Sequence, residues 1–88
     1  MFTMSNKRGN YMRLVEAVGK RLESILKERN MKQNDLAKLG GIPRSSISVI
    51  IGAKRKAVEL DTIYQLCATL EIRLKDFFDD PIFNDVTD

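Results

Sequence analysis

The apolar residues of this chain recur at steps of three and four, a spacing that places them on one face of an α-helix. No stretch alternates apolar and polar residues over the length of a strand, so the pattern predicts an all-α fold. The chain has 88 residues, which is enough for one small domain and too few for two domains with a core each. Five helices are predicted, at residues 11–29, 33–39, 44–51, 60–70 and 73–78.

Glycine and proline separate these helices. Gly40 and Gly41 end the second helix, because glycine adopts a left-handed backbone at no steric cost. Pro43 precedes the third helix, since its fixed φ suits a first helical turn. Gly19 falls inside the first helix and costs it about 1 kcal/mol relative to alanine. We therefore expect that helix to be firm only from Gly19 onward.

Charge and periodicity divide the chain into three parts. We predict a flexible N-terminal arm at residues 1–10, a helical domain at 11–79 and an acidic C-terminal tail at 80–88. Residues 1–56 carry 13 Lys/Arg and four Asp/Glu (net +9), whereas residues 57–88 carry two Lys/Arg and eight Asp/Glu (net −6). This asymmetry indicates a surface that attracts a polyanion, although ordinary solvated faces of a small helical protein remain an alternative.

The residue types that the sequence lacks argue against an enzyme and against a metal-binding protein. The chain has no histidine, which removes the usual general base and the commonest metal ligand. Its single cysteine, Cys67, excludes an internal disulfide and a cysteine-based zinc site. We expect a cytoplasmic, non-enzymatic protein with no cofactor, no metal and no membrane contact. Cys67, Met31 and Leu39 are predicted to lie in the core.

One pattern in the middle of the chain carries more information than the composition. Ala37 supplies a small residue where two steeply crossing helices touch, and Gly41 supplies a turn residue free to take positive φ. Ile47 and Ile50 supply apolar side chains that bury the second of these helices against the first. This is the spacing of a helix-turn-helix.

The wider pattern resembles the Cro/CI-type (XRE-like) helix-turn-helix family of bacterial and phage regulators. The segments that carry the resemblance are Gly19–Ile25, Gln33–Ala37, Ile42–Ile50, Leu60–Ile63 and Leu70–Ile72. It implies a five-helix lambda-repressor-like domain that binds double-stranded DNA and places its third helix in the major groove.

The resemblance also implies which side chains face the bases. By position these are Arg44, Ser45 and Val49, with Ser48 beside them. Arg44 could hold a guanine through O6 and N7, or contact a phosphate instead. Ser45 and Ser46 could bind base or phosphate, or cap the third helix instead. Val49 offers only an apolar surface, which suits a thymine methyl group.

Other residues are implied to hold the DNA backbone. Gln33 opens the second helix, where the family uses glutamine to bind a phosphate and brace the recognition helix; the alternative is an exposed helix-start residue. Lys54, Arg55 and Lys56 follow the third helix and would position the protein without reading sequence. Their alternative is a solvated basic loop.

This chain departs from the family pattern in three places. Leu26 and Ile51 stand where the family often has a buried Arg–Glu ion pair, so we predict an apolar contact between them. Lys32 stands where a capping Ser or Thr is usual. Gly52 comes one residue earlier than the usual turn glycine and Ala53 follows it, which leaves the path of the basic loop open.

Together these features predict a sequence-specific transcriptional regulator, and we expect it to be a repressor. We also expect it to act as a homodimer, because one recognition helix reads too few base pairs for useful selectivity. The apolar residues available for a dimer seam are Phe77, Phe78, Ile82 and Phe83, of which Phe83 is the better candidate. These residues could instead close the core of the monomer. An alternative function is an antitoxin, or a similar interaction protein, whose acidic C-terminal segment binds a basic protein partner.

Overall fold

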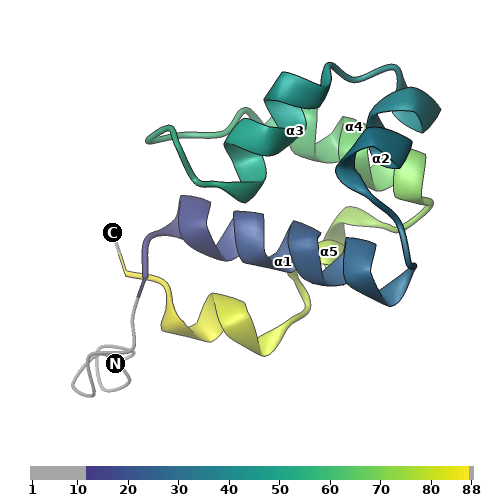
Figure 1. Cartoon of the computed structure of the whole chain (residues 1–88). Coiled ribbons are helices and arrows are strands. Elements are labelled where there is room, and N and C mark those ends of the chain that lie inside the picture. The colour runs from purple at the N-terminus through teal and green to yellow at the C-terminus, as the bar shows by residue number, and fades with distance from the viewer. Residues whose placement is uncertain (1–11, 88) are drawn as a thin grey trace.

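A computed structural model describes residues 12–87, and within them it contains five α-helices and one short 3-10 helix (Figure 1). Their bounds are α1 Leu14–Glu28, α2 Gln33–Gly40, α3 Arg44–Ile51, α4 Leu60–Leu70, α5 Leu74–Phe78 and η2 Pro81–Asp85. The all-α, five-helix prediction is confirmed. The arm predicted at residues 1–10 lies outside the described residues. None of the helices described is long and apolar enough to cross a lipid bilayer.

All five α-helices contribute to a single buried core. Its largest fully buried side chains are Phe77, Leu22, Leu36, Ile47, Leu66, Leu70 and Cys67. Leu26 is also buried and Ile51 packs against this core from α3, in line with the apolar replacement predicted for an ion pair. Met31 is partly buried against the same cluster.

The prediction that Leu39 is buried is wrong. Its side chain is 67% exposed, whereas Leu36 and Ala37 of the same helix are buried. A residue turns about 100° per position in an α-helix, so Leu39 lies roughly 110° around α2 from the midpoint between Leu36 and Ala37. It therefore points away from the side that contacts the core.

The first two helices begin without a serine or threonine cap. The carboxylate of Glu16 accepts a hydrogen bond from the backbone N–H of Arg13 at 2.9 Å, and Asp35 accepts one from Lys32 at the same distance. Each acid sits at the third helical position and reaches back to the residue before the helix, which is half of a capping box. Asp35 thereby compensates for Lys32, where the sequence indicated weak capping.

Gly19 does not weaken the start of α1, contrary to the sequence expectation. The helix begins at Leu14 and continues through Gly19. A Cβ atom on Gly19 would lie 2.5 Å from the carbonyl oxygen of Ile50 and 2.8 Å from that of Ile51. Glycine is needed here because the end of α3 packs directly on the backbone of α1. This contact fixes the position of α3 on the domain.

The C-terminal segment packs on the other side of α1 from α3 (Figure 1). The guanidinium of Arg21 donates to the carbonyl oxygens of Phe77 and Asp76 at 2.7 and 2.9 Å, and it pairs with the carboxylate of Asp80 at 3.2 Å. A cation placed on the last carbonyls of α5 stabilises the end of that helix. The acidic segment is therefore tied to the domain from its first residue.

Backbone hydrogen bonds also join the two ends of the described chain. Met12 forms a parallel bridge with Val86, in which the N–H of Met12 donates to Asp85 and the N–H of Thr87 donates to Met12. Residues 80–87 thus lie against α1 and the start of the described chain.

Three phenylalanines close this side of the core. The ring centroids of Phe77 and Phe78 are 5.0 Å apart, and those of Phe78 and Phe83 are 5.1 Å apart. Phe77 is fully buried and Phe83 is partly buried against the core. Phe83 therefore packs within its own chain, which is the alternative that the sequence left open for these residues.

Candidate nucleic-acid interface

Helix α3 has one buried side and one outward side. Ile47 and Ile50 are 0% and 4% exposed and anchor the helix to the core. Arg44 and Ser45 are exposed on the outward side, and Val49 is partly exposed there. Ser46 and Ser48 are also partly exposed. The helix spans Arg44–Ile51, which are the bounds predicted from its flanking Pro43 and Gly52.

The turn before α3 sets the angle between the two helices of the motif. Gly41 takes φ 63° and ψ 30° after α2, as its position in the pattern predicted. The N–H of Ile42 then donates to the carbonyl of Ala37 at 3.1 Å, which closes the end of α2. Ile42 is 5% exposed and anchors the turn in the core.

The serines at the start of α3 are not used as caps. Pro43 is the residue before the helix and has no side chain that could accept a hydrogen bond. The hydroxyls of Ser45 and Ser46 have no hydrogen-bond partner among residues 12–87. Because neither serine caps α3, which was the alternative role for these side chains, both hydroxyls are available to a ligand.

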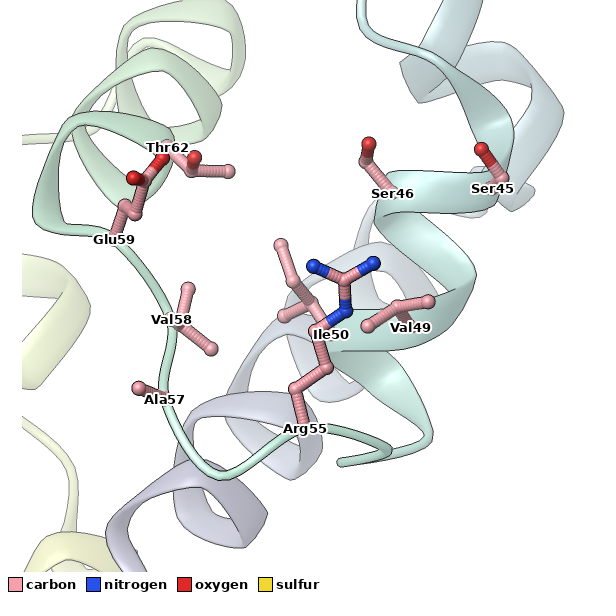
Figure 2. Close-up of a pocket in the computed structure, with 9 residues that line it drawn as sticks. All are labelled: Ser45, Ser46, Val49, Ile50, Arg55, Ala57, Val58, Glu59 and Thr62. Carbon is pink, nitrogen blue, oxygen red and sulfur yellow. The ribbon is translucent and has the colours of Figure 1, made fainter.

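A groove of about 390 Å³ separates α3 from the first turn of α4 (Figure 2). We call it the α3–α4 groove. It is lined by Ser45, Ser46, Val49, Ile50, Arg55, Ala57, Val58, Glu59 and Thr62. The Arg55 side chain extends from the loop toward α3, and the side chains of Glu59 and Thr62 lie on the opposite wall (Figure 2). The groove thus combines hydroxyls, a guanidinium and one carboxylate around an apolar floor.

Arg44 and Gln33 lie together at a second hollow, next to the starts of α2 and α3. Both line this hollow, which α1, the start of α2 and α3 enclose. Glu23, Leu26, Lys27, Met31, Lys32, Asn34 and Ile51 complete its lining. The structure therefore brings together the start of α2 and the start of α3, the two helix ends that the sequence assigned to one DNA surface.

The basic loop leaves α3 through a left-handed turn. Ala53 has φ 51°, whereas Gly52 before it has φ −81°. The N–H of Lys54 donates to the carbonyl of Val49 at 3.1 Å, which fixes the exit of the chain. The left-handed position is thus at Ala53, where the family pattern has its glycine, and the loop runs beside the groove.

The cations at this surface form no ion pair within residues 12–87. Arg44, Lys54, Arg55 and Lys56 are all exposed. The ion pairs in residues 12–87 join Arg13 to Glu16, Arg21 to Asp80 and Arg73 to Asp76, so none involves these four side chains. Helix α3 also carries no acidic residue in its first turn. A surface with four exposed cations and no ion pair of its own attracts a polyanion.

Two polar residues of the α3–α4 groove, Glu59 and Thr62, were not identified as part of the site from the sequence. Glu59 is the residue before α4, and its side chain forms no cap hydrogen bond there. Thr62 lies one turn into α4 and was not singled out. Neither residue carries a local signal for this role, because only the packing of α4 beside α3 brings them to the groove.

The comparisons with known proteins agree with this geometry. A family model described as the Cro/C1-type HTH DNA-binding domain matches residues 21–81. Among solved structures, the prophage Lp1 protein 11 is 32% identical, with a TM-score of 0.72 over 85% of this chain and 100% of the other. No curated protein sequence matches the chain significantly.

Proposed function

Because the chain belongs to the Cro/C1-type helix-turn-helix DNA-binding family, we propose that it is a repressor that binds a specific double-stranded operator. The outward side of α3 enters the major groove in this proposal, and two copies bind as a homodimer. The observation that supports it most is the exposed side of α3, where Arg44, Ser45 and Val49 stand clear of the core while Ile47 and Ile50 hold the helix in place.

Each outward side chain has a role that its chemistry allows. Arg44 reads a guanine through two parallel hydrogen bonds to O6 and N7. Val49 contacts a thymine methyl group, and the hydroxyls of Ser45 and Ser48 bind base edges beside it. Ser46 lines the α3–α4 groove and, in this proposal, its hydroxyl binds a phosphate there.

The remaining contacts position the protein along the duplex. Gln33 binds a phosphate and braces Arg44, whose hollow it shares. Lys54, Arg55 and Lys56 hold phosphates of one strand with no preference for sequence. Repression follows if the bound protein occupies DNA that a polymerase or an activator needs.

The acidic C-terminal segment is a weaker candidate for a protein-binding site than the sequence indicated. Asp80 pairs with Arg21, and η2 packs on α1 of the same chain. A toxin-binding role that uses the Asp80 carboxylate would have to compete with its ion pair to Arg21. The DNA-binding proposal needs no such release.

The preferred DNA site can be found by selecting bound duplexes from a random pool. The Arg44→Ala variant then tests whether Arg44 contacts a specific base in that site. We expect the variant to lose about 1–3 kcal/mol of binding free energy on the selected site and much less on random DNA. Fluorescence anisotropy titrations on both duplexes measure the difference. Lys75→Ala, which removes one exposed charge from α5, serves as the matched control. Equal losses on both duplexes would reduce Arg44 to a phosphate contact.

A further inference from the structure

Glu59 is the one carboxylate among the residues that line the α3–α4 groove. Residues 36–58, which include α3 and the basic loop, carry five Lys/Arg and no Asp/Glu. The first acidic residue after them is Glu59, on the wall of the groove opposite α3 (Figure 2). A negative charge therefore stands beside a surface that otherwise attracts a polyanion.

The contacts within the fold leave this carboxylate unused. The backbone carbonyl of Glu59 accepts hydrogen bonds from the N–H groups of Thr62 and Ile63 at 3.1 and 3.3 Å, which fixes the residue at the start of α4. Its side chain is exposed, forms no cap hydrogen bond and makes no ion pair within residues 12–87. Its remaining contribution to stability is a weak attraction to the dipole of α4. The charge therefore acts mainly on whatever enters the groove.

In the proposed function, a strand of the duplex enters this groove. Ser46 and Arg55, which both line it, bind phosphates of that strand. A phosphate held by these side chains faces the wall that carries Glu59 (Figure 2). Two like charges about 4 Å apart in a watery interface weaken binding by about fivefold, and salt reduces the effect.

We propose that Glu59 is an affinity-limiting residue, whose carboxylate repels the phosphates that enter the α3–α4 groove and so weakens binding to every DNA sequence alike. The inference rests on the proposed DNA function and assigns a role to a residue that reads no base. Its consequence is a more readily reversible complex, because the protein can leave a duplex that its cations alone would hold more tightly.

Two other roles for a glutamate at this place fit the structure less well. A glutamate at a DNA surface can accept a hydrogen bond from the amino group of cytosine. The outward side of α3 reads the bases in the proposed function, whereas Glu59 stands across the groove from α3 (Figure 2). Glu59 could also neutralise Arg55, but no ion pair joins the two side chains. Repulsion of a phosphate requires neither contact.

The test removes the charge and keeps the shape of the side chain. We expect Glu59→Gln to bind both random DNA and the selected site about three- to tenfold more tightly than the wild type at low salt. Asp61→Asn is the matched control, because Asp61 is an exposed acid in the first turn of α4 and does not line the groove. Glu59→Asp keeps the charge and should gain no affinity. Circular dichroism checks that each variant is helical.

Fluorescence anisotropy titrations at several salt concentrations distinguish the outcomes. The gain of Glu59→Gln should shrink as the salt rises, so that log K falls more steeply with log salt than in the wild type. A gain no larger than that of Asp61→Asn would overturn the proposal, as would a loss confined to the selected site, which would indicate a base contact. Failure of the wild type to prefer any duplex would instead refute the proposed function, while titrations on random DNA would still decide the role of Glu59.

Discussion

Ala53 is the residue that turns the chain from α3 into the basic loop, and it does so in the left-handed region at φ 51°. An L-residue with a Cβ pays roughly 1–2 kcal/mol in this conformation. The family pattern places a glycine here, so the chain accepts a local strain at the edge of the proposed DNA-binding surface.

Replacing this alanine should stabilise the protein. We predict that Ala53→Gly raises the free energy of unfolding by about 0.5–1 kcal/mol, because relief of the strain exceeds the extra entropy of glycine in the unfolded chain. Urea denaturation followed by circular dichroism measures it. Ala57→Gly is the control, since Ala57 has negative φ and should lose stability. A loss of stability in both variants would contradict the strain at Ala53.

Cys67 is the second residue with a testable physical property. Its side chain is 1% exposed, and burial raises the pKa of the thiol above its ordinary value, with the charge of Arg21 acting in the opposite direction. A group whose pKa is higher in the folded than in the unfolded state stabilises the fold below the unfolded pKa. That contribution is lost as the pH rises through the folded pKa.

The prediction is a loss of stability at alkaline pH that depends on this thiol. The free energy of unfolding of the wild type should fall as the pH rises above 9.0, the ordinary value for the thiol. Cys67→Ala should show a shallower fall, even if it is less stable throughout because of the lost packing. Denaturation series at several pH values measure both slopes. Parallel slopes would show that Cys67 does not titrate between the two states.

At the scale of elements, the loop of Lys54, Arg55 and Lys56 tests how the protein holds the duplex. Each lysine that contacts a phosphate releases about one counterion on binding. We predict that Lys54→Ala and Lys56→Ala each weaken binding to all sequences and reduce the salt slope of log K by about one unit. Anisotropy titrations at several salt concentrations measure it. Unchanged slopes would place these lysines outside the interface.

The bounds of a helix could be predicted from the sequence where the residues at its ends favour the same limits as its packing in the domain. Pro43 and Gly52 bracket α3, and its bounds match the prediction at both ends. The start of α1 was placed wrongly, because the helix penalty of Gly19 was weighed without the α3 carbonyls that require it. The 3-10 helix η2 was missed, since its position depends on Arg21, some 60 residues earlier in the chain.

In the candidate site, too, the features that depend on one helix could be predicted, and the features that depend on packing between helices could not. The outward side of α3 follows from helix periodicity, so Arg44, Ser45 and Val49 could be identified from the sequence. The wall formed by Glu59 and Thr62 could not, because it exists only where α4 packs beside α3. Periodicity assigns residues to the face of one helix, and it does not say which faces of two helices meet.

For the whole molecule, α1 separates two surfaces with different roles. On one side lie α3 and the basic loop, and on the other lies η2 (Figure 1). The proposal uses the first surface for DNA and leaves the second to hold the chain ends together. Any DNA contact should therefore be confined to one side of the molecule.

Nuclear Overhauser effects between the protein and the base protons of a selected duplex test this claim most directly. We predict contacts from Arg44, Ser45 and Val49 to protons in the major groove, and none from Phe78 or the segment Pro81–Asp85. Contacts from the aromatic side to the duplex, with the outward side of α3 silent, would contradict the account.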